Sequence, residues 1–561
     1  MESQPIQFLD IGIDGIGFYA PMGRLRVEEL ALARGVDPAK YHNGLLLKEF
    51  AVPDYGEDAV SMAIMASIHA LQKSKIDAHS IDAVFIGTET AAYAVKSIAT
   101  ILAGTLGISE NAFTGDLSHA CASATCSLIN AIGLIQAGLI NRALVVGTDV
   151  SKYPIKSPGE PTQGAGAVAL IISKHPRIAQ FSTKFGKISG HVNDFFRPNG
   201  QDSAIVYGQY SVDAYLAFQQ RAYENLEEQI GEFHPNYWIF HSPYAKLSVK
   251  FFARLMLDRW MKHPEFIRDM VQSDDFSLES FGNDVLQGKR LIPLQSIHQL
   301  RKKGFTDEEI CKINSAIDRE MEARLSPSLA VSQNFGNIYS ASVWAQIMAV
   351  LERSAHEQNI LYFGSYGSGA TAIAGLLKVQ PGFREIIEAA PSLQDFIEEK
   401  KYISVIEYER LHKDRQFSNE IVTLGKIQNA GPFLEDQGIS LAFCDSGCVL
   451  PHNRDLAYCP HGHFGRFNRF FPLLSQLDEI REARQVDPLW QLAHNGEAII
   501  LGNAVPGDFL ELNFRKLREE DDKLLQWAPV YVKIPRRLKD AQHPGDLKQL
   551  IRLPEITSQI V

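Results

Sequence analysis

A cysteine at the start of an apolar stretch is the strongest candidate for chemistry in this sequence. Cys121 lies in GDLSHACASATCSLINAIGLIQAGLI, where the residues after it have the spacing of a buried helix. Because a helix N-terminus favours negative charge, we expect a lowered thiol pKa and a reactive thiolate at Cys121. A buried structural cysteine is the commoner alternative, and it is our interpretation of Cys126, five residues further on.

An acid and a histidine each follow a short apolar run. Glu89 comes after AVFIG, and partial burial there would raise the pKa of its carboxyl group toward that of a useful base. His241 comes after YWIF and could move protons near neutral pH. A solvated loop acid and a hydrogen-bonded structural histidine remain open alternatives, and His234 is a lesser rival for the second role. A thiolate, a carboxylate and an imidazole on one face would suit acyl transfer followed by carbanion chemistry.

Strands and helices alternate along the part of the chain that must hold these residues. Apolar runs at 81–87, 142–149 and 166–173 predict buried strands, and 97–107 and 124–140 predict helices, so we expect a layered α/β fold. The carboxyl ends of such strands are where α/β proteins place ligands. Gly-Thr-acid recurs at 87–89 and 147–149, after two of these strands.

The chain divides into three expected parts. Residues 1–175 form an N-terminal half, and residues 176–412 form a second half, in which the charged stretch 262–325 is an expected helical insertion. Residues 413–561 differ in composition and are an expected appended domain outside the condensing chemistry. Their cluster Cys444, Cys448, Cys459, His461 and His463 could hold zinc, but the C-x3-C pair lacks a matching C-x2-C, so a metal-free extension is the alternative.

Composition excludes several classes of function. Apolar residues make up 45% and charged residues 22% of the 561 positions, the balance of a globular protein. The net charge of -11, without a dense basic run, argues against a nucleic-acid partner. We find no signal-peptide pattern and no apolar run long enough for a bilayer, so we expect a cytoplasmic protein without membrane contact. The glycine-rich segments 161–167 and 364–370 match neither a Rossmann fingerprint nor a P-loop, so no nucleotide cofactor is expected.

Taken together, these stretches resemble one known family. The first 410 or so residues are similar to 3-hydroxy-3-methylglutaryl-CoA synthases of the thiolase superfamily, especially the bacterial type. The matching stretches occur in family order: GIDGIGFYAP, GTETAAYAVK, HACASAT, GTDVSKY, SPGEPTQGAGAVA, DFFRPNG, FHSPYAKL, GNIYSAS and FGSYGSG. The resemblance implies an αβαβα fold of two related thiolase-like halves, a homodimer, and no metal or redox cofactor.

The resemblance also implies roles for individual residues. Cys121 matches the acyl-accepting cysteine, Glu89 the general acid/base and His241 the histidine that serves acetoacetyl-CoA. Lys246 is similar to the lysine near the coenzyme A phosphates. Other pocket positions are matched by Asp149, Tyr153, Thr162, Asp194, Asn337, Ser342 and Tyr366. The implied reaction joins acetyl-CoA to acetoacetyl-CoA, as in the mevalonate pathway of isoprenoid biosynthesis.

One departure from the family pattern keeps other functions open. Family members commonly carry an aromatic residue directly after the cysteine, and this chain has Ala122, which could widen the acyl pocket. A polyketide β-branching synthase, which takes acyl groups from an acyl carrier protein, is therefore an alternative. A non-catalytic binding protein of the same fold is a further alternative, which would require a damaged triad.

Overall fold

The computed structural model describes residues 5–413, except 54–56, 94, 199–202, 264–290 and 293, and a set of short strands after residue 413. These strands are β16 (Leu441–Phe443), β17 (Val449–Pro451), β18 (Arg469–Phe471), β19 (Gly502–Val505), β20 (Phe509–Leu512), β21 (Arg515–Leu517), β22 (Leu524–Gln526) and β23 (Val530–Lys533). They pair only with one another, in three small sheets. The candidate zinc ligands Cys444, Cys448, Cys459, His461 and His463 lie outside the described residues.

A large sheet with the order β12-β13-β14-β8-β1-β7-β6-β4-β5 organises the first 380 residues, and β9 adds to it by pairing with β14. Its first half contains β1 (Phe8–Tyr19), β4 (Ala83–Gly87), β5 (Phe113–Leu117), β6 (Arg142–Val150) and β7 (Ala165–Lys174). Its second half contains β9 (Gly186–Ser189), β12 (Tyr237–Phe240), β13 (Ile360–Gly367) and β14 (Thr371–Val379). The short strand β8 (Ala179–Ser182) pairs with both β1 and β14 and so joins the halves.

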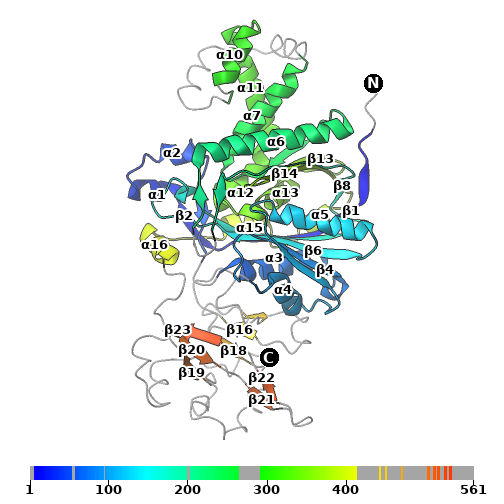
Figure 1. The fold of residues 1–561 in the computed structure, drawn as a ribbon, viewed down its shortest axis with the longest axis vertical. Helices are drawn as coiled ribbons and strands as arrows, with labels where there is room; N and C mark the ends of the chain where they lie inside the picture. The colour runs from blue at the N-terminus through cyan, green and yellow to red at the C-terminus, as the bar shows by residue number, and fades with distance from the viewer. Residues whose placement is uncertain are drawn as a thin grey trace.

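Helices cover both halves of the sheet and also separate them (Figure 1). The helices α5 (Ser123–Gln136) and α13 (Ser342–Arg353) lie between the two halves. On the outside, α3 (Ala59–Ser74) and α4 (Ile98–Leu106) cover the first half, and α6 (Gly208–Ile230) and α7 (Ala245–Met261) cover the second. Three apolar clusters fill the spaces between these layers. The predicted five-layer α/β fold is therefore confirmed.

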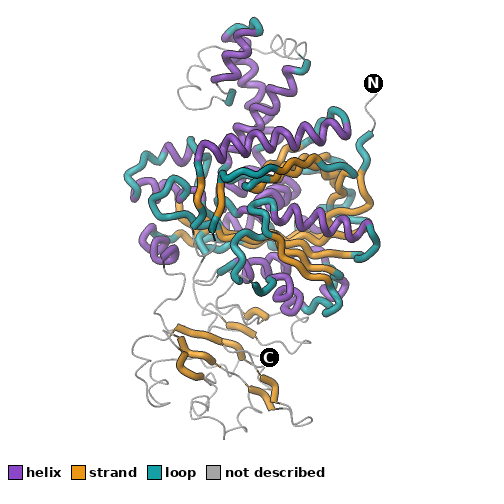
Figure 2. The backbone as a smooth tube through the Cα atoms, in the orientation of Figure 1, coloured by secondary structure: helices purple, strands orange, loops and turns teal. Residues whose placement is uncertain are grey.

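The remaining elements pack within or around this layered core, and Figure 2 shows how helices and strands are distributed along it. Near the N-terminus and after the first half, they are β2 (Gly23–Arg26), α1 (Val27–Ala33), α2 (Ala39–His42), β3 (Glu49–Ala51), β10 (Phe195–Phe196) and β11 (Ile205–Val206). Later in the chain, they are α10 (Leu294–Lys302), α11 (Asp307–Arg324), α12 (Ser326–Phe335), α14 (Arg384–Ile387), α15 (Leu393–Glu398), β15 (Lys401–Tyr402) and α16 (Val405–Lys413). The described part of the expected insertion consists of α10 and α11, which extend beyond the layers (Figure 1). No helix within the described ranges has both the length and the apolar character needed to cross a bilayer.

The repeated Gly-Thr-acid pattern has a simple structural explanation. The strands β4 and β6 are parallel neighbours, and Gly87 pairs with Gly147. Glu89 therefore lies just beyond the end of β4, beside Asp149, which is still paired with Gly166 near the end of β6. The repeated pattern therefore comes from two adjacent strands of one half, and it does not reflect a correspondence between the two halves. Every residue of β4 is buried, because helices cover both faces of this part of the sheet.

Candidate functional site

A tight turn presents Cys121 at the start of α5. The backbone N–H of Ala122 donates to the carbonyl of His119 at 3.1 Å, and the N–H of His119 donates to the hydroxyl of Ser123 at 2.8 Å. Ala120 has a φ of +42°, which is unusual for a residue with a Cβ, and such strain is typical of functional turns. The helix itself begins at Ser123, so Cys121 lies just before its first turn.

Glu89 is the immediate partner of the cysteine. The thiol of Cys121 donates to Oε1 of Glu89 at 3.3 Å, although the two residues are 32 positions apart in the chain. Burial, together with the charge of Asp149, raises the pKa of Glu89 well above its ordinary value, as the sequence led us to expect. Glu89 can therefore accept the thiol proton without moving far.

The expectation of a lowered thiol pKa is wrong. Burial raises the pKa of the Cys121 thiol well above its ordinary value, and the nearby carboxylates of Glu89 and Asp149 raise it further. We expect a helix N-terminus to favour the thiolate, but here burial and the charges of two buried acids outweigh that effect. In the resting protein the thiol keeps its proton, so the proton must pass to a base when the sulfur attacks.

Asp149 holds the loop that carries Glu89. Its side chain is fully buried, and it accepts six hydrogen bonds, from the hydroxyls of Thr88, Thr90 and Ser340 and from the backbone N–H groups of Glu89, Thr90 and Ser340. These bonds engage both carboxylate oxygens. Asp149 was expected to line the substrate pocket, and its contacts instead favour a positioning role, in which it fixes Glu89 opposite the sulfur.

The second half of the sheet reaches the same place through β13. A Cβ added at Gly367 would lie 2.5 Å from the carbonyl oxygen of His119 and 2.7 Å from the backbone nitrogen of Ala122, so the end of β13 packs directly against the Cys121 turn. It would also lie 2.8 Å from the Cβ of Ala122, which is buried, so any space left by this small side chain is bounded by β13.

His241 follows β12, the strand beside β13. Its backbone N–H donates to the carbonyl of Gly364 at 2.8 Å, three residues before Gly367. The imidazole is 1% exposed, and neither ring nitrogen has a hydrogen-bond partner within the described residues. Burial lowers the pKa of His241 to about 3, so the ring is neutral near pH 7. A buried imidazole with both nitrogens unused is placed to bind a ligand.

Other expected pocket residues surround the thiol and the carboxylate. Tyr153 and Tyr366 both lie within electrostatic reach of Cys121. The hydroxyl of Tyr366 donates to Oδ2 of Asp194 at 3.0 Å, and Thr162 is a hydrogen-bond partner of Tyr153. These side chains come from both halves of the sheet, so the site lies where the halves meet.

Two expected pocket residues are buried within the protein framework. The side chain of Asn337 accepts a hydrogen bond from the backbone N–H of Tyr339 at 3.1 Å, and the backbone N–H of Asn337 donates to the carbonyl of Thr162 at 3.0 Å. Ser342 is fully buried at the first turn of α13, where it accepts from Gln346 at 3.2 Å. Their contacts support the loops around the site and do not point to a substrate.

Lys246 lies apart from these residues, on the first turn of α7, and Lys250 follows it one turn later. Burial and the positive charge of Lys250 lower the pKa of Lys246. We did not predict Lys250 as a site residue, although the spacing of four within YAKLSVK places two cations on one helix face. Such a pair favours an anionic ligand.

Sequence reasoning also missed Arg197, which follows β10. Its guanidinium donates to the backbone carbonyl of Glu89 at 2.8 Å, and its charge opposes the raised pKa of that carboxyl group. The motif DFFRPNG contains Arg197, but nothing in the sequence connects it to a residue 108 positions earlier.

Replacing Arg197 with glutamine is expected to move the acid limb of the pH–rate profile to higher pH. Arg197 lowers the pKa of Glu89, so its loss raises that pKa further, and a higher pH is needed before the carboxylate forms. The measurement is kcat/KM against pH for Arg197→Gln and for Arg221→Gln, an exposed arginine on α6. Superimposable profiles for Arg197→Gln and wild type would contradict this role.

Replacing Gly367 with alanine is expected to damage both stability and activity. The added Cβ would meet backbone atoms, which cannot give way as a flexible side chain can, so we expect a loss of about 1–3 kcal/mol in the free energy of unfolding. Displacement of the Cys121 turn should also lower kcat by at least about tenfold. Gly104→Ala is the matched control: nothing lies within 4 Å of its Cβ, and on α4 it should be stabilising. Thermal melts and initial rates test both variants.

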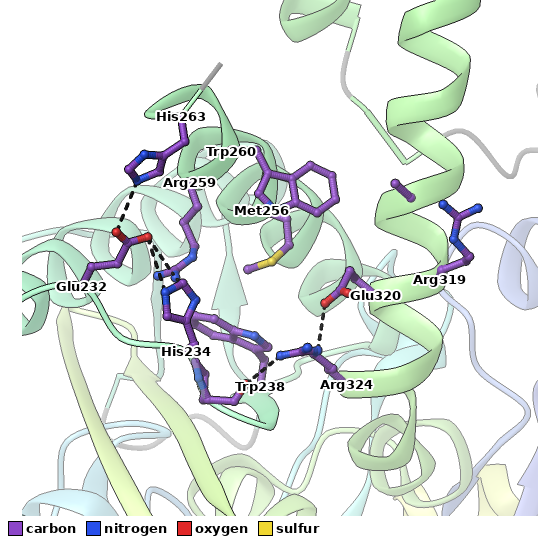
Figure 3. Close-up of a pocket in the computed structure, with 12 residues that line it drawn as sticks. Glu232, His234, Trp238, Met256, Arg259, Trp260, His263, Arg319, Glu320 and Arg324 are labelled. Carbon is purple, nitrogen blue, oxygen red and sulfur yellow. Dashed lines mark hydrogen bonds and ion pairs between the residues drawn. The ribbon is translucent and has the colours of Figure 1, made fainter. Parts of the chain in front are cut away.

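A separate cavity of about 610 Å³ lies between α7 and α11 (Figure 3). Trp238, near the start of β12, lines it, whereas His241 follows the other end of that strand. His234, the rival histidine, lines this cavity and so lies away from Cys121. Charged groups of the cavity pair with one another, as Glu232 does with His263 at 3.3 Å and Glu320 with Arg324 at 2.9 Å.

Comparisons with known proteins agree along the described part of the chain. Residues 7–176 match the family model for the N-terminal part of hydroxymethylglutaryl-coenzyme A synthase, and residues 184–417 match the model for its C-terminal part. A hydroxymethylglutaryl-CoA synthase from Haloferax volcanii is 31% identical over 73% of this chain and 93% of its own length. One from Enterococcus faecalis is 27% identical over 72% of this chain and 91% of its own length.

Solved structures of hydroxymethylglutaryl synthases also match this chain. MvaS in complex with 3-hydroxy-3-methylglutaryl coenzyme A superposes with a TM-score of 0.62 at 27% identity, covering 77% of this chain and 98% of that one. The HMG synthase of the curacin biosynthetic pathway, in complex with an acetyl donor-ACP, has a TM-score of 0.59 at 25% identity, covering 72% and 88%.

Proposed function

This chain belongs to the hydroxymethylglutaryl-CoA synthase family of the thiolase superfamily, and on that premise we propose that it condenses acetyl-CoA with acetoacetyl-CoA to 3-hydroxy-3-methylglutaryl-CoA. The enzyme is a condensing acyltransferase, and its reaction belongs to the mevalonate pathway. The observation that carries the proposal is the hydrogen bond of 3.3 Å between the thiol of Cys121 and the carboxylate of Glu89, at the junction of the two halves.

The first step is transfer of the acetyl group to Cys121. Glu89 takes the thiol proton, the sulfur attacks the carbonyl carbon of acetyl-CoA, and the carbon–sulfur bond to coenzyme A breaks. The coenzyme A thiolate leaves and takes up a proton. Because the pKa of the Cys121 thiol is raised, little thiolate exists before attack, and Glu89 accelerates this step by taking the proton.

The second step forms the new carbon–carbon bond. Glu89, again a carboxylate, removes a proton from the methyl group of the acetyl-cysteine, and the resulting carbanion attacks the ketone carbon of acetoacetyl-CoA. His241 donates an N–H hydrogen bond to the ketone oxygen, on which negative charge develops, and this oxygen then takes up the proton that Glu89 removed from the methyl group. Its unused ring nitrogens and its neutral state support this role. Water then hydrolyses the thioester on Cys121 and releases the product.

Other residues orient the substrates. Tyr153, Thr162, Asp194 and Tyr366 shape the reaction chamber around the thioester. Lys246 and Lys250 hold the phosphates of coenzyme A, since two cations on one face of α7 suit a ligand with several negative charges. Asp149 positions Glu89, as its six hydrogen bonds suggest.

A product assay tests the proposed function. The protein is incubated with acetyl-CoA and acetoacetyl-CoA, and 3-hydroxy-3-methylglutaryl-CoA is identified by mass spectrometry and compared with a synthetic standard. The proposal requires this product and a release of free coenzyme A. Absence of product from a folded protein, over a range of pH, would disprove it.

A carrier-protein substrate is the second candidate, because the curacin enzyme that matches this chain was solved with an acetyl donor-ACP. Ala122 in place of an aromatic residue is compatible with a larger acyl group. The same assay decides between the two when acetyl and acetoacetyl groups are offered on coenzyme A and, in parallel, on a holo carrier protein. A kcat/KM at least about 100-fold higher for the carrier-bound groups would favour this candidate.

We further propose that the protein forms a homodimer through β5. This strand ends the sheet order, so its outer edge is unpaired within the described residues, and Phe113 on it is 55% exposed. An exposed edge strand is suited to pairing with the same strand of a second copy. Sedimentation should give a dimer for the wild type and a monomer for Phe113→Asp. A monomeric wild type would contradict the proposal.

A further inference from the structure

The backbone of Tyr153 is held by side chains on both sides. Its N–H donates to Oε1 of Gln163 at 2.8 Å, and its carbonyl accepts from Nε2 of His412 at 2.7 Å. His412 belongs to α16, the last helix before residue 414, and is 259 positions away from Tyr153. Nε2 of His412 also lies 3.2 Å from Oε1 of Gln163. Because both neighbours are acceptors, this nitrogen must carry the proton.

Gln163 is itself fixed by α16. Its Nε2 donates to the hydroxyl of Tyr408 at 2.6 Å, and that hydroxyl donates to Oε1 of Glu160 at 3.1 Å. The direction of each bond is determined, because the amide N–H can only donate and the carboxylate can only accept. Gln163, Tyr408 and His412 are all buried, so no bulk water competes for these bonds.

An ion-pair network ties the same helix to α1. Arg34, just after α1, makes two hydrogen bonds with Glu160, at 2.9 and 2.7 Å, and a third contact of 2.7 Å with Glu409 of α16. The side chains of Arg34 and Glu160 are 7% and 2% exposed, so this pairing is largely shielded from salt. The network fixes the position of α16 on the rest of the protein.

We propose that α16 positions Tyr153 for the reaction, with His412 and Tyr408 acting as positioning residues. The inference rests on the proposed function, because Tyr153 is one of the groups that shape the reaction chamber. The phenol of Tyr153 lies within electrostatic reach of Cys121 and Glu89, and its ring packs edge-on against Phe195, with the centroids 6.3 Å apart. A shift of the Tyr153 backbone therefore moves an aromatic wall beside the thioester, which makes α16 part of the condensing unit.

Full-length variants of His412 test this inference. His412→Ala removes the donor to the Tyr153 carbonyl, and we expect kcat for condensation to fall about 10- to 100-fold, the scale of a misplacement near 1 Å. His412→Gln retains an N–H at a similar distance and should stay within about threefold of the wild type. Ile406→Ala is the matched control on α16, because Ile406 is 82% exposed and should change neither kcat nor KM.

Hydrogen exchange gives a second readout that does not depend on activity. The acceptor of the Tyr153 amide is Oε1 of Gln163, which His412 also contacts, so loss of His412 should loosen this bond as well. The amide of Tyr153 should therefore exchange at least about tenfold faster in His412→Ala than in the wild type, and at the wild-type rate in His412→Gln and Ile406→Ala. Thermal melts establish that each variant is folded. Unchanged exchange in His412→Ala overturns the inference whatever the activity. Faster exchange with unchanged kcat overturns it as well, because Tyr153 would then not need this support.

The proposed function and this inference fail in different ways. A wild type that forms no product disproves the function, while the exchange rates still decide whether α16 holds Tyr153. A wild type that forms product, together with a fully active His412→Ala variant, leaves the function intact and disproves the inference. Tyr408→Phe should weaken the same support through Gln163, with a smaller loss of kcat than His412→Ala, because it leaves both hydrogen bonds to the Tyr153 backbone in place.

Discussion

Cys121→Ala is expected to abolish both acetylation of the protein and formation of product. In the proposed mechanism the sulfur makes the covalent bond in every turnover, and no other described nucleophile is hydrogen-bonded to Glu89 in its place. We expect kcat to fall by at least about 10⁴-fold, as for loss of other covalent nucleophiles. Fold stability should change little, because the thiol is small and lies on a turn and not in a core cluster. Mass spectrometry after incubation with acetyl-CoA alone should show one acetyl group on the wild type and none on the variant.

Cys126→Ala is the matched control for this experiment. Cys126 lies on α5, one turn after the nucleophile, and is also a free thiol, with a pKa raised by burial alone. Acetylation and turnover should persist in Cys126→Ala. If the acetyl group were found on Cys126, or if Cys121→Ala still turned over at a wild-type rate, the mechanism proposed for Cys121 would be wrong.

The positions of Glu89, Cys121 and His241 relative to the strands and the helix could be predicted, because each follows a feature that is local in the sequence. AVFIG and YWIF are short apolar runs that end in a polar residue, and buried parallel strands produce this pattern. The carboxyl ends of such strands meet at one edge, so the order of residues alone places Glu89 at a ligand-binding edge. The small residues around Cys121 likewise indicate a turn open to substrate.

The electrostatic state of the site could not be predicted in the same way. The thiol pKa depends on how deeply Glu89 and Asp149 are buried beside the sulfur, and these acids are 32 and 28 positions away from Cys121 along the chain. The role of Asp149 depends on Ser340, a partner 191 positions away, and the support of Tyr153 depends on His412. Contacts between distant segments arise from packing of the layers, which no local pattern records.

This packing also bears on the boundary that we propose between the condensing part of the chain and its extension. We expected residues from 413 onward to be dispensable for condensation, with a cut near residue 412. The hydrogen bonds of His412 to Tyr153 and Gln163 place α16 with the catalytic part, and the family match continues to residue 417. A boundary after residue 417 is therefore the better place to separate the extension from the enzyme.

Glu89→Gln is expected to separate acetylation from condensation. In the proposed mechanism the carboxylate removes a methyl proton from the acetyl group, and an amide cannot, so kcat for condensation should fall about 10²- to 10⁴-fold. Acetylation should be slowed less than condensation, because the charge of Glu89 raises the thiol pKa, and its removal makes the thiolate easier to form and so partly replaces the lost base. The thiol of Glu89→Gln should therefore react faster with iodoacetamide than the wild-type thiol at the same pH.

The pH dependence of methyl-proton removal by the wild type should follow from the direction in which the pKa of Glu89 is shifted. The pKa of Glu89 is raised above its ordinary value, so the carboxylate form that acts as base is lost as pH falls through this raised pKa, earlier than for an ordinary glutamate. In deuterated water, the acetyl-enzyme of the wild type should exchange its methyl protons, and this exchange should slow on the acid side and be absent in Glu89→Gln. Glu110→Gln, which replaces an exposed acid, should behave as the wild type. Methyl exchange in Glu89→Gln at the wild-type rate would show that another base removes the proton, and the assignment of Glu89 would then have to be abandoned.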